Sequence, residues 1–305
     1  MLWHNVTTAP NLLGESPFWM AEEGYLYWID IAGRALLRTA PEGGAAQSWP
    51  LPSEPGCAAP VQGGGFVIAL RDGIYRAKEW AGLLECIARL PYDPTTQRAN
   101  DGKCDALGRL WVGTVHEGRP RQPLAALYCV DARAPGAPRV SRVLQGVTTS
   151  NGLAWSPDQR TLYWADTPTH RITAFAVEPG AATLGAPRTL HAFAPKVADD
   201  GEGTYGGRPD GACVDAEGAY WSACYEGARV LRIAPTGEVL AALPLPAQCP
   251  TMPCLGGPDG RTLFVTTARH GRPADELAHY PQSGCVFATH VEVPGLPAGR
   301  FVAAG

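Results

Sequence analysis

One unit of apolar and polar positions recurs along the chain. A short apolar strand leads into a turn that carries Asp and Gly, and a second strand rich in aromatic residues follows. The turns ALGR, SPDQR, AEG and GPDGR have the composition of tight hairpin connections. The unit occurs six times, at residues 15–30, 58–71, 100–114, 151–166, 210–222 and 252–267.

Six hairpins spaced about 40–60 residues apart predict an all-β fold, a six-bladed β-propeller. Each blade would be a four-stranded antiparallel sheet with the recurring hairpin as its inner pair, and helix would stay below roughly 10% of the chain. Six such blades account for the whole sequence, so we expect residues 1–305 to form one domain around a central channel. A strand within residues 3–7 is expected to pair with the last blade near residues 285–293, and residues 196–211 to form an ordered loop at one mouth.

Composition supports this fold and narrows the possible partners. Gly and Pro number 36 and 29 of 305 residues, which a helical bundle could not accommodate. The 45% hydrophobic content argues against disorder, and the formal net charge of −4 argues against a nucleic-acid partner. No apolar run approaches the roughly 18 residues of a membrane helix, and the N-terminus has no signal-peptide pattern. We therefore expect a cytoplasmic protein without membrane or nucleic-acid partners, a monomer or weak homo-oligomer.

The nine cysteines are scattered, odd in number and without a CxxC motif. We interpret them as reduced thiols that serve as small apolar residues, which agrees with a cytoplasmic location. A bridge between Cys249 and Cys254 remains an alternative.

Polar residues stand at the start of four of the recurring units. Inner strands of a propeller line its channel, so side chains at these positions are candidates for a binding site; they are Glu15, Asn100, Asp101, Asn151 and Asp210. A single Asn-Gly or Asp-Gly pair is usually a turn, but turns do not readily explain why polar residues stand at the same position in four units. Converging carboxylates repel one another and normally need a cation.

Glu15, Asn151 and Asp210 form an all-oxygen donor set, which suits a hard divalent ion. We expect one divalent metal, calcium above all because of the Asn carbonyl, with zinc, manganese and iron(II) as alternatives. Three protein ligands would leave coordination positions for water or substrate.

The segments GESPFW, RANDGKCDALGRLWVGT, SNGLAWSPDQRTLYWAD and GRPDGACVD resemble the SMP-30/gluconolactonase/luciferin-regenerating-enzyme family, over about residues 10–302. The resemblance implies a six-bladed propeller with one divalent metal in its channel and hydrolysis of sugar lactones. It places the metal ligands on Glu15, Asn151 and Asp210. It places the substrate contacts on Arg98 and Asn100 of the R-x-N-D-G motif.

The segment GTVHEGRP departs from the family pattern. Some members carry an acidic substrate contact shortly after the Gly-Thr pair, and Glu117 is one residue short of that register. His116, Glu117 or neither would face the sugar, which leaves the identity of the sugar open.

The predicted function is metal-dependent hydrolysis of an aldonolactone such as glucono-, xylono- or arabinono-lactone. Asp210 is assigned as both metal ligand and general base, because a carboxylate can bind the ion with one oxygen and accept a proton with the other. One alternative is a phosphotriesterase- or arylesterase-like hydrolase, which needs a second calcium. The other is a non-catalytic calcium-binding or interaction propeller. The sequence has no GxSxG elbow, which argues against a serine hydrolase.

Overall fold

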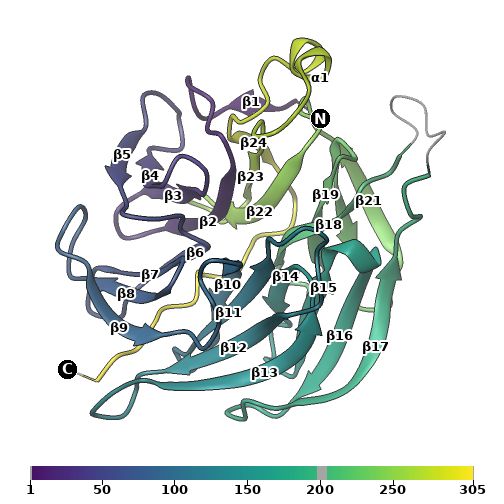
Figure 1. Cartoon of the computed structure of the whole chain (residues 1–305). Helices are drawn as coiled ribbons and strands as arrows, with labels where there is room; N and C mark the ends of the chain where they lie inside the picture. Colours follow the sequence, from purple (N-terminus) through teal and green to yellow (C-terminus); the bar gives the residue numbers. More distant parts are fainter. Residues whose placement is uncertain (1, 198–204, 305) are drawn as a thin grey trace.

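A computed structural model describes residues 2–197 and 205–304. In these residues the chain forms six four-stranded antiparallel sheets arranged as blades around an axis (Figure 1). Blade one contains β2 (Gly14–Met20), β3 (Tyr25–Asp30), β4 (Ala35–Thr39) and β5 (Gln47–Pro50), and blade two β6 (Cys57–Pro60), β7 (Phe66–Leu70), β8 (Gly73–Ala77) and β9 (Glu85–Arg89). Blade three contains β10 (Gln97–Cys104), β11 (Leu110–His116), β12 (Ala125–Asp131) and β13 (Arg139–Val147).

The second half of the chain continues the pattern. Blade four contains β14 (Ser150–Trp155), β15 (Thr161–Asp166), β16 (Arg171–Val177) and β17 (Leu184–Ala192). Blade five contains β18 (Arg208–Val214), β19 (Tyr220–Tyr225), β20 (Arg229–Ile233) and β21 (Val239–Pro244), and blade six β22 (Pro250–Gly256), β23 (Thr262–Thr267), β24 (Phe287–His290) and β1 (His4–Asn5). Helix in the described residues is limited to α1 (Ala274–His279) and the 3-10 turn Thr167–Thr169. The predicted all-β six-bladed propeller is confirmed, and each predicted hairpin is the inner pair of its blade.

The ring closes by joining the two ends of the chain in one sheet. β1 pairs antiparallel with β24, with His4 opposite Ala288, and the Val6 amide donates to the Val286 carbonyl at 2.8 Å. Val6 is fully buried. The predicted closure is confirmed. Residues 198–204 of the predicted mouth loop lie outside the described residues, and residues 208–211, which were also expected in that loop, belong to β18.

Two inner hairpins have the same kind of turn, in which a buried aspartate accepts the hydrogen bonds. Asp105 accepts from the Arg109 amide and from Trp111 Nε1, each at 2.9 Å. Asp215 accepts in the same way from the Ala219 amide and Trp221 Nε1, each at 2.9 Å. The indole N–H groups are thereby satisfied while the rings are buried between neighbouring blades.

Five of the six inner strands contain a bulge near their start. The strand register shifts between Glu15 and Phe18, Ala99 and Gly102, Asn151 and Ala154, Pro209 and Ala212, and Pro250 and Met252. A bulge bends the strand and changes the direction of the side chains that it contains. The polar residues at the blade starts therefore lie at or beside these bulges.

The C-terminal segment crosses the middle of the ring in Figure 1. Residues 296–299 help to enclose a cavity of about 220 Å³ at the end of the channel opposite the beginnings of the inner strands. Cys104, Cys213 and Cys254 also line this cavity. All nine cysteines are free thiols, so the alternative bridge between Cys249 and Cys254 is not formed. Within the described residues, no helix is long and apolar enough to cross a membrane.

Candidate active site

The predicted site residues lie near the beginnings of four inner strands. Glu15 is the second residue of β2, Asn151 the second of β14, Asp210 the third of β18 and Asn100 the fourth of β10. All four are buried, with at most 9% of each residue exposed. We call the end of the channel where these strands begin the site mouth.

Glu15 and Asp210 are close enough to perturb each other's protonation. The pKa of Glu15 is raised well above its usual value, by burial first and then by the negative charges of Asp210 and Asp101. Burial raises the pKa of Asp210 to about 8, and Asp101 adds to the increase. In the described part of the chain neither carboxylate forms an ion pair. Two buried carboxylates without an ion-pair partner are an environment that favours a bound cation.

Asn151 is fixed by hydrogen bonds on both ends of its amide. Its Nδ2 donates to Thr167 Oγ1 at 2.8 Å, and its Oδ1 accepts from Asn100 Nδ2 at 2.7 Å. Thr167 Oγ1 in turn donates to the carbonyl of Pro209, the residue before Asp210, at 2.9 Å. Thr167 therefore links two of the predicted ligands, and its position after β15 gave no sequence signal for this role.

Asp101 is a third buried carboxylate beside the pair. Its Oδ2 accepts from the Leu153 amide at 2.8 Å, whereas its Oδ1 is buried without a hydrogen-bond partner in the described residues. Burial raises its pKa, and the nearby Lys103 ammonium opposes that increase. The sequence pattern singled out Asp101, but not as a member of the metal site.

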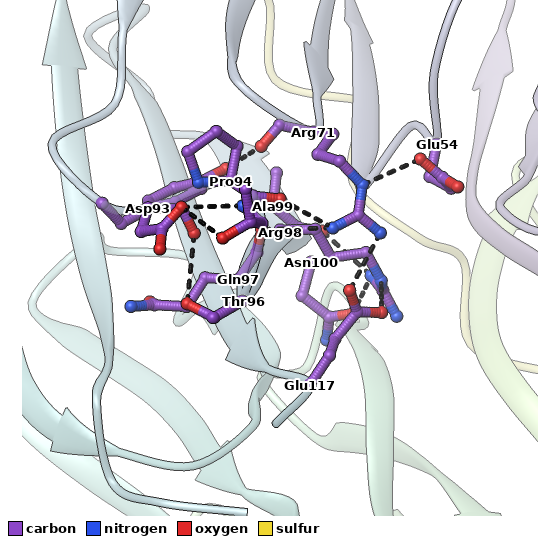
Figure 2. Close-up of polar contacts among 12 residues, drawn as sticks. Glu54, Arg71, Asp93, Pro94, Thr96, Gln97, Arg98, Ala99, Asn100 and Glu117 are labelled. Atoms are coloured by element: carbon purple, nitrogen blue, oxygen red, sulfur yellow. Dashed lines mark hydrogen bonds and ion pairs between the residues drawn. The ribbon is translucent and has the colours of Figure 1, made fainter. Parts of the chain in front are cut away.

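Arg98 is held against Asn100 by a network of charged side chains (Figure 2). Its Nη1 donates to Asn100 Oδ1 at 2.8 Å, and its Nε donates to Glu117 Oε1 at 3.1 Å. Glu117 Oε2 also accepts from Arg71 Nη2 at 2.8 Å, and Arg71 Nε donates to Glu54 at 2.9 Å. The structure thus brings Arg98 and Asn100 together, and Glu117 lies beside Arg98 at the rim. Arg34 Nη2 also donates to Glu54, at 2.9 Å. We call these five residues the Glu117 network: Arg34, Glu54, Arg71, Arg98 and Glu117.

His116 has a different role from Glu117. Its residue is buried, and its Nδ1 accepts from the Gln122 amide at 3.0 Å. The ring therefore holds the loop after β11. Of the two residues considered at this segment, Glu117 is the one that lies next to the predicted substrate contact Arg98.

The donor set at the site mouth consists of two carboxylates and one amide. No group of three His, Cys, Asp or Glu side chains in the described ranges is arranged to hold a metal, so Asn151 would have to complete the set. One Oδ1 lone pair of Asn151 accepts from Asn100, which leaves a second lone pair on that oxygen. Oxygen donors of this kind fit a hard divalent cation.

The cavity at the opposite end of the channel has a different chemistry. Its lining residues come later along the same inner strands, such as Phe18 on β2 and Cys213 on β18, and include no carboxylate. Lys103 also lines it and donates to the Ala212 carbonyl across the channel, from β10 to β18. The groups that could activate water therefore lie at the site mouth.

Comparison with known proteins identifies the family of the chain. Residues 13–269 match the model of the SMP-30/Gluconolactonase/LRE-like region. The chain belongs to this family. It is an enzyme of the lactonase class, in a family of sugar lactone hydrolases and regucalcins.

Two curated relatives and one solved structure show how fully the family likeness covers the chain. A 6-deoxy-6-sulfogluconolactonase of Pseudomonas putida is 43% identical over 297 residues, 97% of each chain. Regucalcin of Danio rerio is 36% identical over 292 residues, 94% of each chain. The crystal structure of regucalcin from Agrobacterium tumefaciens, described as a calcium-binding protein, superposes with a TM-score of 0.87 at 26% identity and covers 97% of this chain and 96% of its own.

Proposed function

We propose that this lactonase hydrolyses an aldonolactone with the help of one divalent metal ion held by Glu15, Asn151 and Asp210. The observation that carries the proposal is the buried Glu15–Asp210 pair. Burial raises the pKa of both carboxyl groups, the charge of Asp210 raises that of Glu15 further, and neither group has an ion-pair partner among the described residues. Calcium is the preferred ion because of the all-oxygen donor set, and regucalcin neighbours support that choice.

The bound ion would supply Lewis-acid polarisation of the lactone carbonyl. Asp210 accepts a proton from the water whose oxygen attacks the carbonyl carbon. The bond between that carbon and the ring oxygen then breaks, and the ring oxygen leaves as a hydroxyl with a proton returned to it. Arg98 and Asn100, joined at 2.8 Å, orient the sugar hydroxyls above the carboxylates.

The substrate is proposed to be a five- or six-carbon aldonolactone. Glucono-, xylono- and arabinono-lactone share the reacting group and differ in their substituents. The Pseudomonas putida relative is named for 6-deoxy-6-sulfogluconolactone, which has the same ring with a sulfonate on carbon 6. We include that compound among the candidate substrates.

The test is a lactone panel assayed with chelated protein reloaded separately with calcium, zinc, manganese and iron(II). Asp210→Asn keeps a ligand oxygen and loses the proton acceptor, so kcat should fall by about 10²- to 10⁴-fold. Glu15→Gln removes a charged ligand at constant size and should lower metal content after dialysis. Asp131→Asn, a surface carboxylate paired with Arg133, is the matched control and should change neither quantity.

Two results would contradict the proposal. A fully metallated Asp210→Asn enzyme with wild-type kcat would remove Asp210 as the base. Two metal ions per wild-type chain with arylester hydrolysis and no lactone hydrolysis would favour the phosphotriesterase-like alternative.

A further inference from the structure

A second group of charged side chains borders the site mouth on the side of blades five and six. Glu226, which follows β19, is almost fully buried and receives cations from three parts of the chain. Arg208 at the start of β18 donates to Glu226 Oε2, Arg272 Nη1 donates to Oε1 at 2.9 Å, and Lys196 Nζ lies 3.4 Å from Oε1. Arg272 Nε also donates to Glu276 at 2.9 Å. We call these five residues the Glu226 cluster.

The Glu226 cluster contains more positive than negative charge. Among the described residues, Lys196, Arg208 and Arg272 form ion pairs with Glu226 and Glu276, so three cations meet two carboxylates and the formal charge of these five residues is +1. In the described part of the chain, three of the five N–H groups of Arg272 donate to these carboxylates. The Arg272 guanidinium therefore keeps two N–H groups that these carboxylates do not occupy.

The cluster lies beside the proposed reaction centre. Arg208 precedes Asp210 by two residues on β18, and among the charged neighbours that perturb the pKa of Asp210 it has the largest effect, a lowering one. The ring of Tyr225 lies against both arginines, 4.9 Å from the Arg208 guanidinium carbon and 5.8 Å from that of Arg272. Burial raises the pKa of Tyr225, and the negative charge of Asp210 adds to the increase, so this ring is near both the cluster and Asp210.

The backbone at Glu226 is strained in a way that favours a functional role for the side chain. Glu226 has a φ of +64°, in the left-handed region where Gly or Asn costs least. A buried Glu in that conformation carries both a conformational and a desolvation cost. Such residues persist where the surrounding structure holds them for binding or catalysis.

We propose that the Glu226 cluster binds a tetrahedral anionic substituent, a sulfonate or a phosphate, carried by the lactone at a distance from its carbonyl. This inference rests on the proposed lactonase function and names the substrate class more narrowly. An anionic substituent cannot approach Glu15, Asp101 and Asp210 without repulsion, so it needs cations at the rim of the site. Arginine forks match the oxygens of such anions in charge and geometry.

The Glu117 network on the opposite side of the mouth is less suited to this role. Arg71 uses four of its N–H groups on Glu54, Glu117 and the carbonyls of Pro94 and Gln97 (Figure 2). Its guanidinium is therefore committed to fixing Glu117 and the strand that carries Arg98. Arg34, at the outer end of that network, is more than half exposed and offers a control with the same change of charge.

The experiment compares kcat/KM of the metal-loaded protein for gluconolactone, 6-deoxy-6-sulfogluconolactone and 6-phosphogluconolactone. In Arg272→Gln the ratio of either anionic lactone to gluconolactone should fall about 10- to 100-fold, the size expected for loss of charged hydrogen bonds. Arg272→Lys keeps the charge and should restore part of the ratio. Arg34→Gln should leave the ratio within about two-fold of wild type.

An unchanged ratio in Arg272→Gln would overturn the inference, including the case in which hydrolysis of all three lactones falls equally. A fall of the ratio in Arg34→Gln instead would also overturn it, because the anion would then be recognised by the Glu117 network. Calorimetry with glucitol 6-phosphate against glucitol measures binding without turnover. If the wild type opens no lactone but binds the phosphate through Arg272, the lactonase proposal fails and the anion site stands.

Discussion

At the scale of single residues, we expect the buried aspartates of the inner hairpins to contribute more to stability than a surface ion pair does. Asp215 has no exposed side-chain surface, and its oxygens accept from two backbone amides, from Trp221 and from Arg232 at 2.8 Å. Asp215→Ala leaves these donors unpaired inside the fold. The free energy of unfolding should fall by about 3–5 kcal/mol, measured by urea denaturation.

Asp131→Ala is the matched comparison, because Asp131 pairs with Arg133 at the surface at 2.7 Å. That change should cost less than about 1 kcal/mol. Equal losses in the two variants would show that burial of the Asp215 network adds no stability.

At the scale of elements, the bulges of the inner strands set the positions of the site residues. Gly152 lies in the bulge of β14, next to Asn151, with a φ of +62°. A Cβ added there would fall against the Tyr220 hydroxyl and 3.1 Å from the carbonyl oxygen of Asp210. The bulge therefore brings the backbones of β14 and β18 together at the point where two proposed ligands stand.

Gly152→Ala should push β18 away from β14 and separate Asn151 from Asp210. We expect metal affinity, measured by calorimetry, to fall by at least about ten-fold, with about 1–3 kcal/mol lost in stability. Gly24→Ala provides the control, since Gly24 has a φ of +69° but open space around it. If both variants bind metal equally well, backbone contact at this bulge does not position the ligands.

At the scale of the whole molecule, the ring depends on one short strand. β1 completes the sixth blade, and the fully buried Val6 packs with Leu26 and Trp28 of blade one and Phe264 of blade six. Val6→Asp would bury an unpaired charge at this junction. The Tm should fall by about 5–10 °C, measured by calorimetry.

Leu2→Asp is the control, because it introduces the same negative charge four residues earlier, at a residue that is 87% exposed. It should leave the Tm within about 1 °C of the wild-type value. An equal Tm for the two variants would mean that closure of the ring does not limit unfolding.

The sequence by itself determined the architecture and the central residues of the candidate site. Hairpin repeats encode the blades locally, because turn residues and strand alternation act over fewer than ten residues. The sequence singled out Glu15, Asn151 and Asp210 for the same reason: each stands at the start of a recurring unit whose first strand lines the channel. The pairing of residues 3–7 with the last blade also followed from the need to close the ring.

Only the tertiary structure decided how side chains from different blades meet. Three contacts join strand residues to residues on loops, whose paths no periodic pattern fixes. They are the pairing of Glu117 with Arg98 and Arg71, the link from Thr167 to Asn151, and the Glu226 cluster. The bulges in the inner strands also could not be predicted from the sequence pattern. A register shift of one residue changes which side chains face the channel. Contacts between loops of neighbouring blades depend on loop geometry and burial, and these exist only once the ring has formed.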